Sequence, residues 1–503
     1  MTQALNLANL ANYINSSGKL DASQALTGTV TSTGLNISND ASISGLTVGK
    51  GAGSNTTNNT ALGLSALGVN TTGYQNDAIG GKTLYSNTTG NTNTAVGFAS
   101  LYSNTSGVNN AGFGNSALYS NSTGSYNTAI GQLALQANTT ASNNTAVGYQ
   151  AAYSATTAPA VTAIGSQAGY SITTAGSVAA TFVGASAGYS NTTGYNDAFG
   201  SGALYTNATG VANAAFGYHS LYSNTGSYNT ALGMQALQSN TTASNNTAVG
   251  YQAGYSNTTG SITAVGYQAG YALTTGTRNT FIGYQSGKLL STNNYNCMVG
   301  SFSGTNCLGS TNTFVGDYAG GNATSGSGNT FLGQYAGGDV TTGAKNTIIG
   351  GYGGNQNGVD IRTASNWVVL SDGDGVWKAV QSASAAWYQV NNSASWGTTS
   401  DSRIKENIVD LNKGLDVITS LRPVTFDYIK NKKADVGFIA QEYQAVLPDQ
   451  VSIQDGIDEE TKKLIGGTDD LLSINQNLTP YLVKAIQELN AKVTALEAQL
   501  GTK

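Results

Sequence analysis

Ser400 and Lys405 are a pair of side chains whose types and spacing could carry out covalent chemistry. They lie five residues apart in the stretch GTTSDSRIKEN, residues 397–407. A serine hydroxyl becomes an effective nucleophile when a neighbouring base takes its proton. Lysine can be that base if burial or another cation lowers its pKa, and Arg403 could supply that cation. The spacing therefore allows a serine–lysine nucleophilic site, although an isolated pair of this kind is more often a serine that caps a helix or turn and a solvated lysine.

Other kinds of site have little support in the sequence. The four acidic residues between positions 51 and 359 are scattered, with no two in one repeat, whereas a glycosidase needs a close carboxylate pair. His219 is the only histidine and has no metal-ligating neighbours, so we expect a structural role for it and no metal or cofactor. Cys297 and Cys307 are the only cysteines, which excludes a disulfide framework and favours a reduced, cytoplasmic site of synthesis.

Charge divides the 503 residues into two regimes. Between Gly51 and Val359 only eight residues are charged and their net charge is zero, whereas residues 400–503 contain 28 charged residues. The net charge of −5 argues against nucleic-acid binding, which needs clustered lysine and arginine. The start lacks a basic leader and no apolar run approaches the ~20 residues of a spanning helix, so we expect no secretory signal and no membrane insertion.

A repeat dominates the uncharged region. The pattern Asn-Thr-Ala-apolar-Gly, as in NTAVG at 93 and NTAIG at 127, recurs every 16 to 17 residues, with one interval of 19. We call its last residue the marker glycine, and the residue before it is apolar in all 18 units. The marker glycines are Gly63, Gly80, Gly97, Gly114, Gly131, Gly148, Gly165, Gly184, Gly200, Gly217, Gly233, Gly250, Gly266, Gly283, Gly300, Gly316, Gly333 and Gly350. The period predicts a stacked β-architecture.

Within each unit we expect a strand at NTAVG, a second strand at segments such as YQAGY, and a turn at SNTTG. The third residue after the marker glycine is always small, which indicates close packing there. Ten units carry tyrosine five residues after the marker glycine, and this ladder could stack on sugars or simply reflect strand propensity.

One such coil offers little interior, since it holds one dependable large apolar residue plus Ala and sometimes Leu. A repeat cannot bury its apolar face alone, so we expect several chains to share one interior. The prediction is an elongated, mainly β, trimeric β-solenoid or β-roll shaft of about 18 repeats of 17 residues. The unit resembles the head repeats of trimeric autotransporter adhesins and the repetitive shafts of phage tail fibres.

The period is lost between residues 359 and 399, where NWVVLSDGDGVWKAVQ reads as a hairpin in a β-rich cap or linker. We predict four segments in all: residues 1–50 for virion attachment, 51–358 as the shaft, 359–399 as the cap, and 400–503 as a separate domain. In that last domain, Leu482, Ile486, Leu489, Val493, Leu496 and Leu500 form a heptad seam after Pro480. This spacing predicts a coiled coil over 480–500.

Residues 400–503 also resemble a known module. Four ordered blocks, SDSRIKENI, LNKGLDVITSLRPVTFDY, DVGFIAQEYQAVLPDQV and LLSINQNLTPYLVKAIQEL, are similar to the intramolecular chaperone of auto-processing found in endosialidase tailspikes and phage fibres. The resemblance implies a small α+β domain that templates a homotrimer and then cuts itself off. It assigns Ser400 as the nucleophile, Lys405 as its base and Thr399–Ser400 as the scissile bond. Asp401, Arg403, Glu406 and Asn407 match the same motif in supporting roles, and Ser402 competes as nucleophile with a spacing that does not fit.

The sequence thus predicts a structural tail fibre or receptor-binding appendage of a phage virion, assembled in the host cytoplasm, whose only enzymatic activity is autoproteolysis. Expected partners are its own copies in a homotrimer, tail or baseplate proteins at the N-terminus, and a host surface receptor such as a glycan. The alternatives are a non-viral bacterial surface adhesin of trimeric β-roll type without enzymatic activity, and a depolymerising tailspike, which the scattered carboxylates disfavour.

Overall fold

A computed structural model describes residues 41–43, 46–51, 58–173, 179–384, 387–389, 406–429, 434–453, 471–474 and 478–501. The chain divides into two compact units, Met1–Trp396 and Gly397–Lys503, and each is described by itself. The predicted boundaries at residues 50, 358 and 399 remain predictions.

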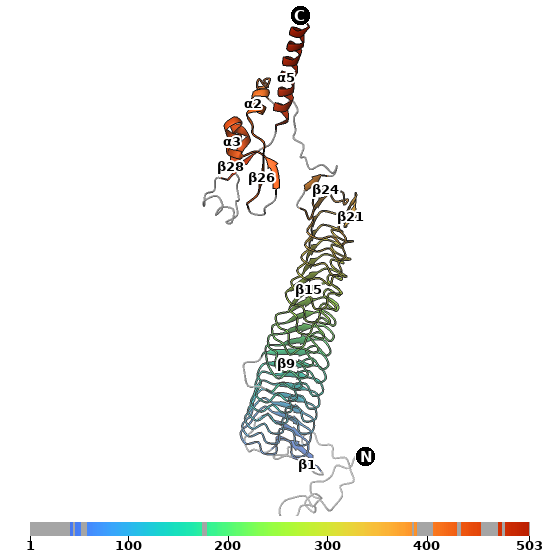
Figure 1. Cartoon of the computed structure of the whole chain (residues 1–503). Coiled ribbons are helices and arrows are strands. Elements are labelled where there is room, and N and C mark those ends of the chain that lie inside the picture. Colours follow the sequence, from blue (N-terminus) through green and yellow to red (C-terminus); the bar gives the residue numbers. More distant parts are fainter. Residues whose placement is uncertain are drawn as a thin grey trace, which may run out of the picture. The chain divides into compact units, whose positions relative to one another are not determined.

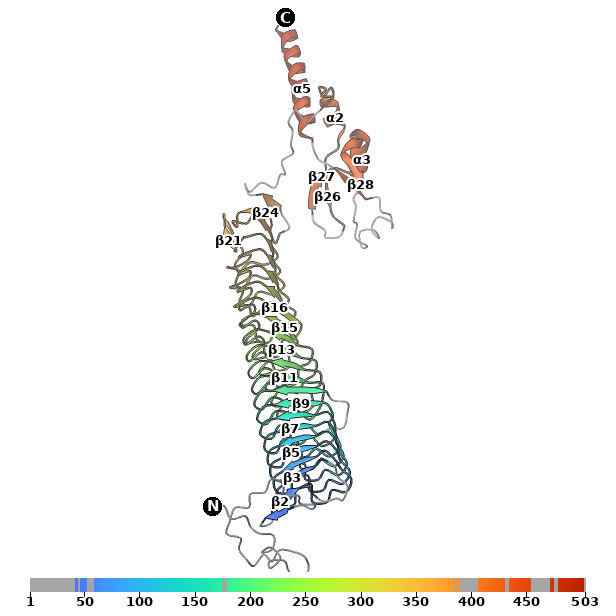
Figure 2. The same ribbon diagram turned by 180° about the vertical axis from the view of Figure 1, so that it is seen from behind.

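The first unit is a β-solenoid in which every repeat forms one coil (Figures 1 and 2). Each coil contributes one short strand that ends at the residue before its marker glycine, and consecutive strands pair in parallel without a register shift, as in Ala95↔Gly112 and Ala129↔Ala146. The strands are β3 (Thr60–Leu62), β4 (Asp77–Ile79), β5 (Thr94–Val96), β6 (Ala111–Phe113), β7 (Thr128–Ile130), β8 (Thr145–Val147), β9 (Val161–Ile164), β10 (Ala180–Val183), β11 (Asp197–Phe199), β12 (Ala214–Phe216), β13 (Thr230–Leu232), β14 (Thr247–Val249), β15 (Ile262–Val265), β16 (Asn279–Ile282), β17 (Cys297–Val299), β18 (Thr313–Val315), β19 (Thr330–Leu332) and β20 (Thr347–Ile349). The predicted solenoid of about 18 repeats is confirmed.

Antiparallel strands close both ends of this stack. At the start, β1 (Ala41–Ile43) pairs with β2 (Leu46–Gly49), which pairs antiparallel with β3. At the other end, β23 (Val368–Ser371) continues the parallel stack, and β24 (Trp377–Gln381) and β25 (Trp387–Gln389) follow as antiparallel strands. The predicted hairpin is thus present, beside a small pair made of β21 (Asn355–Gln356) and β22 (Val359–Asp360). Such ends limit further edge pairing.

The marker glycines are required because neighbouring coils approach closely at these positions. Gly131 has φ +134°, and a Cβ on it would lie 2.4 Å from the carbonyl oxygen of Gly148 in the next coil. A side chain would therefore separate the coils. The 19-residue interval does not disturb this contact, since Gly165 approaches Gly184 in the same way.

The second strand expected at segments such as YQAGY is wrong. These residues form consecutive turns in which one or two residues per coil take left-handed backbone angles, for example Leu67 at φ 49° and Leu84 at φ 49°. The turns still bond to the next coil, as when the Leu84 N–H donates to the Ser100 carbonyl at 3.0 Å. Each coil therefore has one strand.

The solenoid has a buried interior within one chain, which is more interior than the sequence suggested for a single coil. The sharing of a further interior between chains remains a prediction. In every strand from β3 to β20 the residue two before the marker glycine is buried. The small residues three after it are buried as expected, and so are the leucines four after it in the early coils, such as Leu67 and Leu118.

Asparagine fills the remaining interior in two buried columns. Asn110 belongs to the column that begins each strand: its Oδ1 accepts the backbone N–H of Asn127 at 3.0 Å, and its Nδ2 donates to the Gly124 carbonyl at 2.8 Å. Asn87 belongs to the column in the SNTTG turn, and its Nδ2 donates to Asn70 Oδ1 at 2.8 Å. An amide is both donor and acceptor, so a column that repeats every coil satisfies itself.

In its described residues the second unit is a small α+β domain with eight elements (Figure 1). The helices are α2 (Leu415–Ser420), α3 (Ala440–Val446), the 3-10 turn η3 (Pro448–Gln450) and α5 (Thr479–Leu500). Two antiparallel pairs join β26 (Val424–Asp427) with β27 (Ala434–Gly437), and β28 (Val451–Ile453) with β29 (Leu472–Ile474). The helix expected over 480–500 is therefore present, and its association into a coiled coil remains a prediction.

Candidate functional site

The predicted serine–lysine pair lies outside the described residues. This holds for Ser400 and Lys405, for Thr399 at the proposed scissile bond, and for Asp401 and Arg403. Glu406 and Asn407 are described, and both are exposed at the start of the second unit. Asn407 has φ 55°, so the chain turns there through a left-handed conformation that asparagine tolerates. The dyad itself remains a prediction.

The segment that follows the predicted dyad is fastened to α5. Gly414 packs directly on this helix, so that a Cβ at Gly414 would lie 2.3 Å from the backbone nitrogen of Ala485. The next residue, Leu415, donates its backbone N–H to a carboxylate oxygen of Glu488 at 2.8 Å. Since the N-cap of α2 has no side-chain cap of its own, Glu488 supplies one from the neighbouring helix. The two contacts couple α2 to α5.

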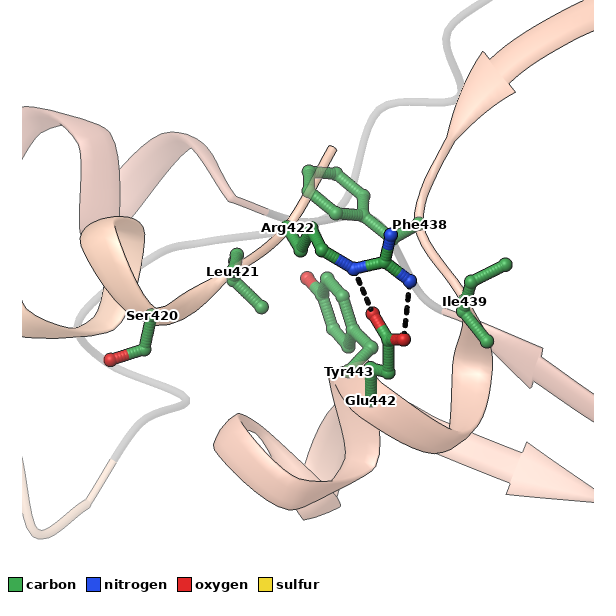
Figure 3. Close-up of a pocket in the computed structure, with 7 residues that line it drawn as sticks. All are labelled: Ser420, Leu421, Arg422, Phe438, Ile439, Glu442 and Tyr443. Atoms are coloured by element: carbon green, nitrogen blue, oxygen red, sulfur yellow. Dashed lines mark hydrogen bonds and ion pairs between the residues drawn. The ribbon is translucent and has the colours of Figure 1, made fainter. Parts of the chain in front are cut away.

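A small apolar core holds the rest of the unit together. Leu421, Tyr443 and Leu447 are buried, and partly buried residues from α2, β28, β29 and α5 pack around them. Figure 3 shows Tyr443 lying beside Leu421 and the Arg422–Glu442 pair, where the side chains leave a hollow of about 30 Å³. The Tyr443 hydroxyl is buried without a hydrogen-bond partner among the described residues, and burial raises its pKa. A hollow this small has room for about one water molecule.

An ion pair closes the rim of that hollow. The Arg422 guanidinium donates to both carboxylate oxygens of Glu442, from Nε at 3.0 Å (Figure 3). This hydrogen bond to Arg422 lowers the pKa of Glu442 below its ordinary value. Both side chains are largely exposed, so water screens the pair and it contributes little to stability. The pair therefore links α3 to the loop before β26.

Helix α5 leaves its heptad seam uncovered. Only Ala485 is buried among its residues, on the side that faces Gly414. The six seam residues, Leu482, Ile486, Leu489, Val493, Leu496 and Leu500, are each between 43% and 72% exposed. A row of exposed apolar residues at this spacing is typical of a helix that packs against other helices.

The tyrosine ladder on the solenoid does not offer open ring faces along its length. Tyr153, Tyr170, Tyr189, Tyr205 and Tyr222 stack with ring centroids 5.0 to 5.1 Å apart and planes within 10° of each other. Each inner ring is therefore covered on both faces by its neighbours, which argues against sugar stacking at those rungs. Because the ladder lies in the turns, strand propensity does not explain it either; the stacking itself does.

His219 has the structural role expected from the sequence. Its ring lies against Tyr218 and Tyr222, with centroids 3.8 and 4.5 Å away, and burial lowers its pKa. Among the described residues there is no cluster of three or more potential metal ligands, and no helix there is long and apolar enough to cross a membrane.

The two units define a repetitive β-solenoid joined to a compact α+β domain that ends in a helix. Residues 400–452 match the family described as chaperone of endosialidase, so the chain carries a domain of that family after its shaft. This match confirms the resemblance over residues 400–452, and the last sequence block, which begins at Leu471, remains a prediction.

Among curated proteins the chain is similar to two phage fibre proteins. It is 33% identical over 111 residues to the long tail fiber protein Gp37 of Enterobacteria phage M1, and 32% identical over 111 residues to that of Enterobacteria phage Ox2. Each match covers 21% of this chain and 41% of the relative, so the chain spans about two fifths of the length of these relatives. No solved structure matches the chain.

Proposed function

We propose that this chain is the subunit of a homotrimeric phage tail fibre whose C-terminal domain aligns three copies and then releases itself. The observation that carries the proposal is the order of the parts: a chaperone-of-endosialidase domain directly follows a solenoid of eighteen near-identical coils. The likeness to two long tail fiber proteins supports the same assignment and a place in the virion.

Alignment is a physical need of such a shaft. Because successive coils are nearly alike, two chains shifted by one coil would match almost as well as two chains at the same level. The uncovered seam of α5 offers a unique reference point, since three copies that bury Leu489, Val493 and Leu496 together begin at one level. A parallel bundle at this end would set the register of everything before it.

Self-cleavage would follow once the domain has folded. In the proposed reaction Lys405 takes the proton of the Ser400 hydroxyl, and the oxygen attacks the carbonyl carbon of Thr399. The bond from that carbon to the Ser400 nitrogen breaks as Lys405 returns the proton to this nitrogen, which leaves as a free amine. Water then hydrolyses the resulting ester, which frees a fragment that begins at Ser400. Losing the bundle removes a route of unfolding and leaves the shaft kinetically stable.

The N-terminal segment 1–50 would then attach to the phage tail, and the shaft would reach a receptor on the host surface. Denaturing gels of freshly expressed full-length protein, with N-terminal sequencing of any small fragment, test the processing step. Ser400→Ala and Lys405→Ala should each abolish the fragment while native mass measurements still find trimers. Ser402→Ala is the matched control and should cleave normally. Cleavage that persists in both dyad variants would remove the dyad, and a monomer at all concentrations would remove the fibre assignment.

A further inference from the structure

The solenoid carries an apolar row on its outer surface. In each of the strands β3 to β20 the penultimate residue points inward. The last residue therefore points outward, because side chains alternate along a strand. We call these last residues the outer strand row: Leu62, Ile79, Val96, Phe113, Ile130, Val147, Ile164, Val183, Phe199, Phe216, Leu232, Val249, Val265, Ile282, Val299, Val315, Leu332 and Ile349. All eighteen are Leu, Ile, Val or Phe, and none of them is buried.

This exposure reverses what the sequence suggests. The residue before the marker glycine is the most regular large apolar residue of the repeat, yet Leu232 is 50% exposed while Ala231 beside it is fully buried. A soluble chain seldom leaves a continuous apolar strip of this length open to water, and such strips mark interaction sites. The strands that bear the row stack along one side of the solenoid, as Figure 2 shows.

The residues around the row also suit burial against a neighbour. Most strands carry an uncharged threonine two positions before the row, and the only charges at that position are Asp77 and Asp197, both exposed. On its other side, the residue after the marker glycine is often apolar and exposed, as at Phe98 (54%) and Tyr251 (37%). The carboxylates can stay hydrated at a rim while the apolar residues lie at the centre.

The spacing of the row selects its partner. Its side chains recur once per coil, at the ~4.8 Å separation of neighbouring strands. A partner that meets every rung must have the same repeat over the same length, and another copy of this chain has both by construction. Three-residue strands over eighteen coils give a face of roughly 10 by 80 Å, on the order of the 800 Å² that each partner buries in a stable interface.

We infer that the outer strand row is the surface through which three copies of this chain pack along the shaft, each rung against the same rung of its neighbours. The inference rests on the proposed homotrimer. It specifies which face of each chain is buried and how the coils of neighbouring chains align. Rotation about an axis along the shaft places identical residues at one level, so symmetry requires this register. A shift of one chain by one coil relative to its neighbour would instead place Leu232 opposite Val249.

Cysteine cross-linking tests the face. The native Cys297 lies on the same strand side and is first changed to threonine, the residue that most strands carry there, while the buried Cys307 stays. Leu232→Cys then places a thiol in the row, and Thr242→Cys, in the exposed turn of the same coil, is the matched control. Full-length trimers with Ser400→Ala are treated with a short bismaleimide and separated under denaturing conditions. We expect at least tenfold more covalent dimer from Leu232→Cys than from Thr242→Cys.

A mixed experiment tests the register. Chains with Leu232→Cys and tagged chains with Val249→Cys are co-expressed and oxidised, since a disulfide needs Cα atoms about 4.4–6.8 Å apart and so distinguishes a shift of one coil. Disulfides between unlike chains should be rare beside those between like chains. Equal cross-linking at Leu232→Cys and Thr242→Cys, or none at Leu232→Cys in an intact trimer, would contradict the outer strand row as the trimer interface. Abundant mixed dimers would contradict the alignment of equivalent coils. Absence of any trimer would instead refute the proposed function, so the failures are distinguishable.

Discussion

The ring of Phe281 occupies the space that a side chain at Gly287 would need. A Cβ built on Gly287 would lie 2.4 Å from the ring, and one on Gly270 in the preceding coil would lie 2.6 Å from it. Coils with a small residue in the strand show the opposite combination, as with Ala231 and Leu237, both fully buried. In coils with a large buried strand residue the glycine therefore leaves room for it, and in coils such as that of Ala231 a leucine fills the same space. Ala248 with Gly254 is an exception, since both positions are small.

This relationship predicts how paired substitutions behave. Phe281→Ala should destabilise the shaft by about 3–5 kcal/mol because it leaves a cavity, and Gly287→Leu should destabilise it by at least about 1–3 kcal/mol because it overfills the coil. The double variant should recover much of either loss, since it recreates the Ala231–Leu237 arrangement, and leucine accepts the left-handed backbone at that position in other coils. Thermal unfolding followed by circular dichroism measures all three. Additive losses in the double variant would contradict the volume argument.

The buried asparagine columns predict a large effect from a polar substitution. Asn110→Ala would leave the Asn127 backbone N–H without its partner at 3.0 Å and would remove one of the two amides that donate to the Gly124 carbonyl, the other being Asn121. Each unsatisfied buried group costs about 1–3 kcal/mol. Asn115→Ala, at an exposed asparagine in the adjoining turn, is the control and should change the midpoint of thermal unfolding little. Equal effects of the two substitutions would mean that the columns do not stabilise the stack.

The columns are also where sequence reasoning had least to work with. Asparagine is usually exposed, so its recurrence in most units indicated turns and not an interior. The sequence did contain an indication of burial, because asparagine recurs at the same positions of successive units. A turn that formed only local hydrogen bonds would tolerate Asp, Ser or Gly at most of these positions. Where Val161 and Ile262 interrupt one column, the Nδ2 groups of Asn144 and Asn246 have no partner among the described residues. These interruptions show that the amides depend on their neighbours in the stack.

The period, the parallel stacking and the close approach at the marker glycines were predictable, because each follows from residues that recur at fixed spacing. The direction in which the outer strand row points was not. Both Ala and the larger aliphatic residue suit an interior, and which of them faces inward depends on how tightly the coil closes. In the second unit the helix over 480–500 followed from its heptads, whereas the contact of Gly414 with Ala485 joins residues far apart in the sequence and has no local signal.

Burial of Cys307 predicts a pH-dependent difference between the two thiols. Burial raises the pKa of Cys307 to about 11 from an ordinary value of 9.0, against smaller opposing effects of hydrogen bonding with the backbone of Gly309 and the side chain of Asn312. At pH 8 roughly one molecule in a thousand would carry the thiolate. Iodoacetamide should therefore modify the half-buried Cys297 well before Cys307, as peptide mass spectrometry can follow.

The same shift affects stability in alkaline solution. The folded state keeps the proton of Cys307 up to about pH 11, whereas the unfolded chain loses it near pH 9.0, so the unfolded state binds fewer protons between these values. The contribution of this thiol is fully present below pH 9.0 and is lost as pH rises towards 11. Cys307→Ala should weaken the fall in unfolding temperature over that window. An identical fall in both proteins would assign the effect to other groups.

Gly414 predicts a defect confined to the second unit. Gly414→Ala would place a Cβ 2.3 Å from the Ala485 nitrogen, which is backbone and cannot move aside, so α5 must shift away from α2 and the Glu488 hydrogen bond to Leu415 must lengthen. We expect a loss of about 1–3 kcal/mol in this unit, read out as faster proteolysis of residues 406–501 while the solenoid stays resistant. Gly501→Ala is the control, because the nearest atom to its Cβ would lie at an ordinary 3.4 Å. If the domain aligns the chains as proposed, Gly414→Ala should also lower the yield of trimer. An unchanged yield from a destabilised domain would show that α5 assembles without its contact with α2.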